Sequence, residues 1–566
     1  MAGNKTLRLT VATLFAGASL GAGTVAHGAN SPMRPAASNV ISITDWQFPA
    51  GCNTLSANQE ASVEGCAAET YDSLVGINNK LDDFADLATV IPTAKNGGVK
   101  VVGGNQIVTW TLKPNLKWSD GQPLTVDDAM FGVPLNIALG NNTGLDQIKS
   151  MKKVSDRVFQ VTYKGVYAPY VDYGPLNVYP RHYLEKKYGT TNAAAIAKKF
   201  GLDAYNSPND VFSGPYKIGS WTNGQNVTLV QNPYYNALPA ASGHPRPSQI
   251  KFVTIANDEA ALAQALQSPK AGVDAAEDFQ TSDIPTLNGA KSYTIHSVPG
   301  LLIEHLELNQ AGVLKDARLR QALQYAVNKT ELVHQLFPAL SDPNSIVERN
   351  VLPIPNRFYD KSQPISEYNP AKAKALLKAA GYATDYNGPG KHLSLRLVAT
   401  QTSARVKSFG ILARYWATVG IHVSPGFGAS SGNNGIYESW ANNGVLQHGR
   451  FDIALMAYQE SPDPQQSEPN YNPANIPGPS NTSGQNESHI TDADQYALLQ
   501  SAGHQLDAAQ RLSTFHKWQQ LVNSRVYWIP LYNRPQISAD NGTIGNYQPH
   551  PGQQSNEWNS FQWYKK

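Results

Sequence analysis

Helical and strand-like segments alternate between residues 316 and 458, and this alternation constrains the fold more than any other feature of the sequence. Helical patterns cover 316–337 and 369–382, the segment 405–423 is a helix that runs into a strand, and strand-like runs cover 393–400 and 450–458. Such alternation is expected of a mixed α/β lobe, in which helices pack on a sheet. A chain of 566 residues also exceeds the usual size of one domain, so we expect at least two large lobes.

Two of the predicted helices have readable ends. In 316–337, Asp316 is placed to cap the N-terminus, and one face carries the apolar residues Leu319, Ala322, Leu323, Ala326 and Val327. In 369–382, Asn369 is the predicted cap, Pro370 takes the first helical position and Gly381 ends the helix.

The first half of the chain is richer in strands and turns. Polar and apolar residues alternate along 106–112, which predicts a strand, and 211–236 reads as a hairpin around Thr222-Asn223-Gly224. No solenoid-type repeat is visible. The most economical architecture is therefore two mixed α/β lobes with a ligand cleft between them.

The stretch NLKWSDGQPLTVDD, residues 115–128, contains two adjacent carboxylates, Asp127 and Asp128. A catalytic interpretation would make them a paired acid and base, because neighbouring carboxylates can hold different pKa values. A structural interpretation makes Thr125 an N-cap and places both acids in the first turn of a helix, where negative charge is favoured. Adjacent side chains on a helix do not face each other, so we predict the structural role.

Residues 1–28 have the pattern of a secretory signal peptide. Lys5 and Arg8 precede the uncharged, apolar run 9–26, and small residues suited to cleavage follow. The run contains three glycines and is marginal for a membrane span of about twenty residues. We therefore expect cleavage and an extracytoplasmic location, periplasmic or at the cell surface, rather than a retained anchor.

Cys52 and Cys66 are the only two cysteines of the chain. In an exported protein such an isolated pair is expected to form a disulfide. Closing a loop of about 15 residues would contribute roughly 3 kcal/mol in the chain-entropy model. The alternative is a lipid on Cys52, since PAGC (49–52) faintly resembles a lipobox, but the apolar run ends too early, so we expect no lipobox.

The charge of the chain is nearly balanced. Lys and Arg number 45 against 43 Asp and Glu, a net charge of +2, which offers no general attraction for nucleic acid or an anionic membrane. HExxH, P-loop and zinc-ligand spacings are absent, and the 13 histidines do not cluster. We expect no metal, no cofactor and no nucleic-acid partner. The polar segment 461–489 predicts a long loop.

One short motif could suggest an enzyme. GASSG, residues 428–432, matches G-x-S-x-G with Ser430 as the would-be nucleophile of a secreted hydrolase. That motif requires a strand, a tight turn and then a helix. The Gly- and Asn-rich residues that follow are a poor helix start, so we do not expect catalysis.

Six segments occur in an order typical of one family. They are WTLKPNLKWSDGQPLTVDDAMFG (110–132), SGPYKIGSWTNGQNVTLVQNPYYN (213–236), LKDARLRQALQYAVNKTELV (314–333), NPAKAKALLKAAGY (369–382), FDIALMAYQESPDP (451–464) and SRVYWIPLYNRPQ (524–536). Together they resemble the extracytoplasmic solute-binding proteins of the peptide-transport family, family 5, which are the oligopeptide- and dipeptide-binding components of ABC importers. One such segment would be weak, whereas six in order are a specific match.

The resemblance implies an α/β, bilobal type II periplasmic-binding-protein fold with an extra subdomain in the first lobe. The limits it suggests are 40–75 and 208–300 for the core of lobe I, 76–207 for the extra subdomain, 301–529 for lobe II, and 530–566 for a return to lobe I. It also implies a monomer that captures a peptide by lobe closure, passes it to a transmembrane permease, and performs no chemistry.

The resemblance also suggests site residues. In peptide-binding members an acid four positions before the Pro of the Asp-Pro segment pairs with the ligand's α-ammonium group, and counting back from Pro464 gives Glu460. The Trp expected three residues before that acid is replaced by Ala457, and counting forward from Phe451 puts the aromatic position at Tyr458, so the alignment shifts by one. The alternative is that Glu460 is a solvated residue at a strand end.

Further candidates flank this acid. Arg405, at the start of its helix, could bind a ligand carboxylate through two hydrogen bonds, or it could be an ordinary surface arginine. Tyr458 and Gln459 could form pocket walls, or Tyr458 could belong to the core. The alternative is that the solute is an oligosaccharide or another small molecule, as it is for some relatives in this family. The 10 Trp and 27 Tyr of the chain would suit stacking on sugars.

Overall fold

The computed structural model describes residues 39–55, 66, 68–268, 270–552 and 556–566. The predicted signal peptide, residues 1–28, lies outside the described residues. Inside the described ranges, no helix combines the length and the apolar character that crossing a membrane requires.

Ten strands form the main sheet, in the order β14-β13-β15-β12-β16-β11-β1-β10-β9-β8. Their bounds are β1 Val40–Thr44, β8 Tyr216–Thr222, β9 Asn226–Gln231, β10 Gln249–Val253, β11 Ala275–Phe279, β12 Thr294–Leu308, β13 Leu393–Thr400, β14 Ile421–Gly428, β15 Ile453–Gln459 and β16 Trp528–Asp540. Pairs β13–β14 and β1–β10 are parallel, whereas β12 pairs antiparallel with both β15 and β16.

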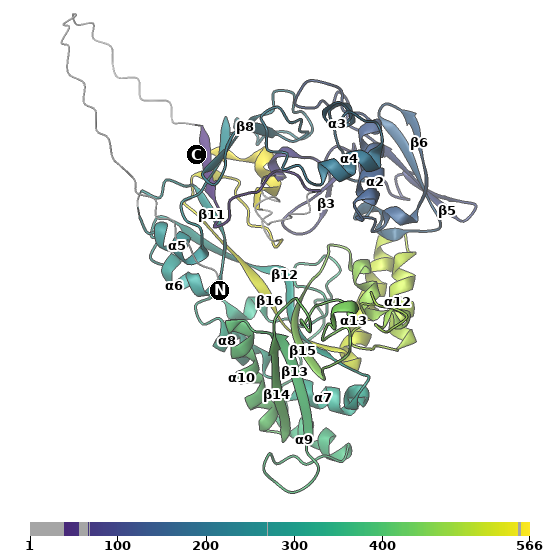
Figure 1. Cartoon of the computed structure of the whole chain (residues 1–566), viewed down its shortest axis with the longest axis vertical. Coiled ribbons are helices and arrows are strands. Elements are labelled where there is room, and N and C mark those ends of the chain that lie inside the picture. The colour runs from purple at the N-terminus through teal and green to yellow at the C-terminus, as the bar shows by residue number, and fades with distance from the viewer. Residues whose placement is uncertain (1–38, 56–65, 67, 269, 553–555) are drawn as a thin grey trace, which may run out of the picture. The chain divides into compact units, whose positions relative to one another are not determined.

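The two longest strands, β12 and β16, join the two halves of this sheet. They pair from Thr294 opposite Asp540 to Glu307 opposite Trp528. β16 also pairs with β11, and β12 pairs with β15, so each half of the sheet is reached through one of them. Figure 1 shows both strands running between the upper and lower groups of elements. Two lobes are therefore tied by continuous strands, while the domain limits given above remain a prediction.

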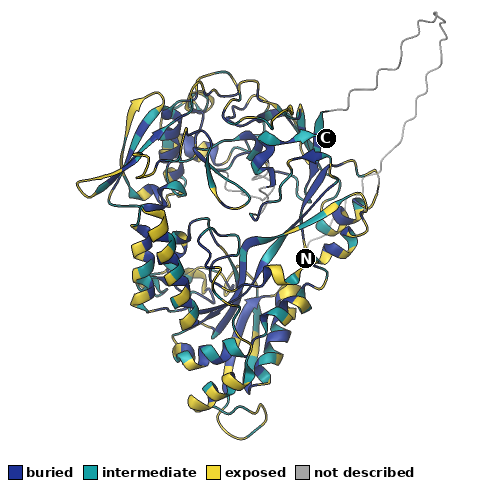
Figure 2. Ribbon diagram, turned by 180° about the vertical axis from the view of Figure 1, so that it is seen from behind, coloured by how far each residue is buried: buried dark blue, intermediate teal, exposed yellow. Residues whose placement is uncertain are grey.

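Helices pack around the sheet and bury its apolar side chains. Their bounds are α2 Val126–Ala138, α3 Arg181–Tyr188, α4 Ala193–Phe200, α5 Glu259–Ala265, α6 Ile284–Leu287, α7 Ala317–Tyr325, α8 Lys329–Leu336, α9 Pro370–Ala379, α10 Ser403–Ala417, α11 Glu468–Tyr471, α12 Ala493–Gly503 and α13 Ala508–Arg525. Leu323, Leu397, Trp416 and Ile421 share one core between α7, α10, β13 and β14. Figure 2 shows dark blue on much of the sheet in this region and yellow on the outer helix faces, and six of the eight residues of β13 are buried.

The segment 316–337 forms two helices, so the prediction of a single helix is wrong. Asp316 caps α7 as expected, since its carboxylate accepts a hydrogen bond from the Arg318 amide at 2.9 Å. The chain then breaks at Asn328, whose side chain caps α8 by accepting from the Glu331 amide at 3.0 Å. Asn is a strong N-cap and a poor residue for a helix interior, which explains the break.

The other predicted elements with clear end signals are confirmed. Asn369 caps α9 by accepting from the Lys372 amide at 2.9 Å, and Pro370 is the first helical residue. Gly381, just beyond the end, has a φ of +86°, a conformation that glycine adopts without strain. The predicted hairpin is the β8–β9 pair, and Gly224 in its turn has a φ of +69°.

A separate antiparallel sheet has the order β4-β5-β7-β6. Its strands are β4 Val99–Val102, β5 Asn105–Thr111, β6 Ile148–Ser155 and β7 Val158–Tyr163, and two small sheets pair β2 Val75–Ile77 with β3 Asp83–Ala85 and β17 Ile544–Gly545 with β18 Tyr564–Lys565. Trp110 on β5 lies opposite Phe159 on β7, and both are fully buried. This sheet therefore has a core of its own.

Asp127 and Asp128 begin α2, which confirms their structural role. Thr125 Oγ1 accepts from the Asp127 amide at 3.3 Å, and Asp128 Oδ2 accepts from the Thr125 amide at 2.9 Å, forming a capping box. The buried Asp128 carboxylate also accepts from Trp118 Nε1 at 3.3 Å. Asp127 instead points to solvent and pairs with Lys153 at 2.5 Å.

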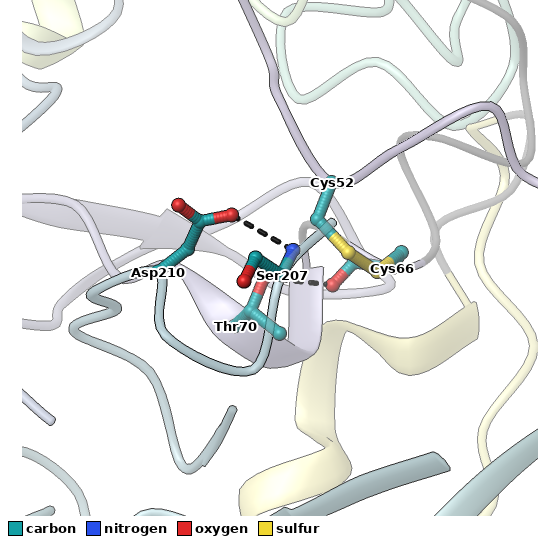
Figure 3. The surroundings of a disulfide bond; sticks show 5 residues. All are labelled: Cys52, Cys66, Thr70, Ser207 and Asp210. Atoms are coloured by element: carbon teal, nitrogen blue, oxygen red, sulfur yellow. Dashed lines mark hydrogen bonds between the residues drawn. A yellow bond between two sulfur atoms is a disulfide. The ribbon is translucent and has the colours of Figure 1, made fainter. Parts of the chain in front are cut away.

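Cys52 and Cys66 are joined by a disulfide in the structure, with their Cα atoms 5.4 Å apart (Figure 3). Both residues are fully buried. Thr70 Oγ1 donates to the Cys66 carbonyl at 2.9 Å, and the Ser207 amide donates to Asp210 Oδ2 at 2.8 Å nearby. The bridge therefore lies inside the core that includes Ile41 of β1, Leu229 of β9 and Ile250 of β10.

The segment 461–489 is more ordered than its polar composition predicted. It contains the 3-10 turns Pro464–Ser467 and Pro473–Asn475 and the short helix α11. Prolines at the first positions of these turns pre-set the helical φ, and Tyr471 anchors the segment in the core with no exposed surface. The prediction of a plain long loop is corrected accordingly.

Candidate functional site

Glu460 follows the last residue of β15 and is buried, with 2% of its surface exposed. Its amide donates to the Leu301 carbonyl at 3.3 Å, which continues the pairing of β15 with β12. Its carboxylate accepts one hydrogen bond, from Ser467 Oγ at 2.5 Å. Within the described part of the chain no Lys, Arg or His forms an ion pair with it. Glu460 is therefore not the solvated strand end of the alternative interpretation.

Burial raises the pKa of Glu460 to about 7, and the hydrogen bond from Ser467 opposes this only in part. A carboxylate removed from water is stabilised when a cation pairs with it. The position is thus suited to a ligand that carries a positive charge.

Tyr458 and Gln459 have different environments. Tyr458 is half-buried, and its ring centroid lies 6.1 Å from that of Trp528 on β16. Gln459 is exposed, at the end of β15. Sequence reasoning missed Trp528, although it lies within the closing segment 524–536, because nothing in the local pattern pointed to its contact with Tyr458.

The Asp-Pro segment after Glu460 is fixed by an internal ion pair. Asp463 has no exposed surface, and Arg511 on α13 reaches its two carboxylate oxygens at 2.5 and 2.8 Å. Asp463 also caps the turn that follows by accepting from the Gln465 amide at 2.9 Å. Its carboxylate is therefore committed to the fold and positions the chain beyond Glu460.

Arg405 is buried, so its interpretation as a surface arginine is wrong. Its Nε donates to Glu304 Oε1 at 2.6 Å and its guanidinium also donates to the Tyr437 hydroxyl at 2.8 Å. Arg534 reaches the other oxygen of the same carboxylate, Glu304 Oε2, at 2.7 Å. Desolvation raises the pKa of Glu304, but the charges of Arg534 and Arg405 outweigh it, so the pKa lies below its ordinary value. The site therefore holds two cations and one anion.

A cavity of about 270 Å³ lies beside this cluster, lined by Glu304, Arg405, Arg534, Thr402, Tyr532 and other residues. The side chain of Arg534 is 43% exposed, whereas that of Arg405 is 7% exposed. Arg534 is thus the more accessible cation, and apart from its place in the segment 524–536 no sequence pattern pointed to it.

The structure does not bring Arg405 and Glu460 together. Arg405 contacts Glu304, which lies opposite Ala457 on β15. Side chains alternate along a strand, so Tyr458 points to the other face of the sheet, where it meets Trp528. The predicted site residues therefore belong to two separate places, one at each face.

A larger cavity of about 360 Å³ contains none of the residues predicted from the sequence. Its lining includes Tyr71, Asp72, Phe84, Asp86 and Trp558. Burial raises the pKa of Asp86 to about 7. The described residues contain no group of three or more His, Cys, Asp and Glu side chains arranged to hold a metal ion.

Ser430 does not occupy a nucleophile elbow. β14 ends at Gly428, and turns and bends lead from there to the short 3-10 helix Trp440–Asn442. Ser430 is exposed, and its carbonyl accepts from the Tyr437 amide at 3.0 Å. The strand–turn–helix geometry required by that motif is missing here.

Comparison with known families gives one extended match. The model described as "Bacterial extracellular solute-binding proteins, family 5 Middle" matches residues 89–480, which is more than half of the chain. The match includes Glu460, Arg405 and the four-stranded sheet.

Three relatives are named as peptide-, oligopeptide- or dipeptide-binding proteins. A Brucella ovis protein named for peptide binding by an ABC transporter is 23% identical over 475 residues, covering 78% of this chain and 81% of its own. The oligopeptide-binding protein AppA of Bacillus subtilis is 28% identical over 335 residues, covering 57% of each chain. The dipeptide-binding protein of Escherichia coli is 25% identical over 357 residues, covering 58% of this chain and 63% of its own. These relatives are binding proteins rather than enzymes.

Solved structures share the fold. The oligopeptide-binding protein of Thermus thermophilus in complex with a pentapeptide has a TM-score of 0.65 at 22% identity, covering 93% of this chain and 96% of its own. The murein tripeptide-binding protein MppA in its unliganded open form has a TM-score of 0.73 at 17% identity, covering 94% and 98%. The predicted bilobal type II fold is confirmed.

Proposed function

Because the chain belongs to the bacterial extracellular solute-binding proteins of family 5, we propose that it captures peptides outside the cytoplasm and delivers them to the permease of an ABC importer. The names of the relatives described above support peptides over oligosaccharides as the solute. In this proposal the protein acts as a monomer, is exported by the signal in residues 1–28 and carries out no reaction.

The observation that carries the proposal is the buried carboxylate of Glu460, which lacks a cationic partner among the described residues. A peptide α-ammonium group would supply that partner, and each charge would offset the desolvation of the other. Tyr458, two positions before Glu460 and therefore on the same face of the strand, would contact the adjacent part of the peptide. Gln459 belongs to the opposite face, where Arg405 and Arg534 would offer positive charge to an anionic group bound in the cavity beside them.

The test is the substitution Glu460→Gln, which keeps the shape and removes the charge. Binding of unmodified di- to pentapeptides, followed by thermal shift, should weaken by well over tenfold, since truncating one partner of a desolvated pair typically costs about 2–5 kcal/mol. N-acetylated peptides should bind the wild type weakly and lose little more on mutation, because both changes remove the same interaction.

The control is Glu367→Gln, which removes an exposed carboxylate without altering the site. It should leave peptide affinity unchanged. Equal affinity of Glu460→Gln and wild type for the same unmodified peptide would show that Glu460 does not hold its ammonium group.

A further inference from the structure

Arg357 connects two parts of the molecule that have separate cores. The residue after it, Phe358, packs against Phe515 of α13, with ring centroids 4.8 Å apart. The guanidinium of Arg357 lies 5.3 Å from the centroid of the Phe358 ring and meets two carboxylates, Asp83 Oδ2 at 2.7 Å and Asp172 Oδ2 at 2.6 Å. Asp83 begins β3, and Asp172 follows the 3-10 helix Ala168–Val171, whose Tyr170 belongs to the core of the four-stranded sheet.

A second contact joins the same two parts. The Tyr173 hydroxyl, next to Asp172, donates to Gln466 Oε1 at 2.8 Å and to the Asp463 carbonyl at 3.3 Å. Figure 1 shows α12 and α13 below the four-stranded sheet, and Figure 2 shows the same neighbourhood from behind. The contacts of Arg357 are therefore part of one interface.

This interface adjoins Glu460. Asn356, the residue before Arg357, donates from Nδ2 to the carbonyls of Ser461 at 3.1 Å and Pro462 at 3.3 Å. Those two residues directly follow Glu460. A change in the position of Arg357 would therefore move Asn356, and through its hydrogen bonds the chain next to Glu460.

We propose that Arg357, through its ion pairs with Asp83 and Asp172, is a positioning residue that holds the two lobes closed beside Glu460 and thereby sets the affinity for the solute. We call this three-residue contact the Arg357 latch. The latch lies outside the ligand site. Its role in closure is independent of the proposed function, whereas its role in affinity rests on that function.

The charges of the latch fit this role. The side chains of Arg357 and Asp172 are 19% and 4% exposed, so the ion pair is screened little by salt. Among the described residues, Asp83 Oδ1 and Asp172 Oδ1 have no hydrogen-bond partner. Desolvation raises the pKa of Asp172, and the charge of Arg357 opposes that shift. Without Arg357, two poorly solvated carboxylates would face each other, and separation of the lobes would rehydrate them.

The closure test needs no solute. Spin labels are placed on Val154→Cys of β6 and Ala375→Cys of α9, which are exposed positions away from the latch, and the distance between them is measured by pulsed electron resonance. The wild type should give mainly the short distance. Arg357→Met should shift the distribution to longer distances, and Arg357→Lys, which keeps the charge but not the fork of donors, should fall between them.

The matched control is Arg318→Met, which removes an exposed ion pair of the same type, with Asp316 at 2.6 Å. It should leave the distance distribution unchanged. If Arg357→Met fails to fold, Asp83→Asn removes one of the two pairs and should give a smaller shift in the same direction. The proposal would be overturned if Arg357→Met folds and gives the same distance distribution as the wild type. If only Asp83→Asn folds, the same result for that variant would overturn it.

Affinity gives the second readout. If the latch variant lowers the closed fraction tenfold, the Kd for a bound peptide should rise about tenfold, because only the closed state binds tightly. An open Arg357→Met with unchanged Kd would contradict the affinity part of the proposal. Loss of peptide binding in Glu460→Gln with an unaltered distance distribution would separate the ligand site from the latch.

Discussion

Asp127 and Asp128 are adjacent in the chain, but their carboxylates have opposite environments. Asp128 is 5% exposed and accepts hydrogen bonds from Trp118, the Thr125 amide and the Arg181 amide. Asp127 has a side chain that is 44% exposed and forms a surface ion pair with Lys153. The two residues should therefore differ sharply in what they contribute to stability.

We expect Asp128→Ala to destabilise the protein by about 1–3 kcal/mol, because it removes a helix cap and leaves buried donors without a partner. Asp127→Ala should cost about 0–1 kcal/mol, as is usual for an exposed ion pair. Urea unfolding of the two variants measures the difference. Equal losses would show that the capping box contributes no more than the surface pair does.

The role of Asp128 could be predicted from the sequence, because its cap and its helix lie within a few residues. The environment of Arg405 could not. Its partner Glu304 is 101 positions away, and only the assembled sheet brings the two together with Arg534. The same reason kept Trp528 out of the predicted site, since its contact with Tyr458 depends on the pairing of β12 with both β15 and β16.

At the scale of elements, local signals predicted most of the helices and strands of the second half. β13 coincides with the predicted strand 393–400, and α9 has the predicted cap, first residue and terminating glycine. The break between α7 and α8 was missed because the apolar pattern continues through Asn328, so hydrophobic periodicity alone favoured one helix.

Asn328→Ala tests the cause of this break. Removing the side chain that accepts from the Glu331 amide should cost about 1 kcal/mol of stability, the usual value for an N-cap. Asn142→Ala, which alters an exposed asparagine far from α8, is a suitable comparison. A thermal midpoint equal to that of the wild type would mean that packing, and not the cap, sets the start of α8.

At the scale of the whole molecule, the bilobal fold was predicted through six separated segments. The order of the ten strands was not, because β12 and β16 pair over a separation that no local pattern encodes. The four-stranded sheet has a core of its own, and the Arg357 latch lies where that sheet meets the core of α12 and α13.

The exported form makes a prediction about the intact chain. The mature protein should begin near residues 27–30 and carry Cys52 bonded to Cys66. Intact mass after export, with and without reduction before alkylation, checks both claims at once. Two alkylated cysteines without prior reduction would contradict the disulfide, and the mass of the complete chain would contradict cleavage.

The most direct test of the central claim is proton release when a peptide binds. Burial holds the pKa of Glu460 near 7 in the free protein, so the group is largely protonated at pH 6. An ammonium group needs the ionised carboxylate, and binding at pH 6 should therefore release about one proton per peptide. Affinity should rise with pH up to about 7 and level off above that value.

Calorimetry of the best-binding unmodified peptide at pH 6, in two buffers with different ionisation enthalpies, measures this release. If Glu460 holds the peptide ammonium group, the binding heats should differ between the two buffers for the wild type and be equal for Glu460→Gln. Equal heats in both buffers for the wild type would contradict it.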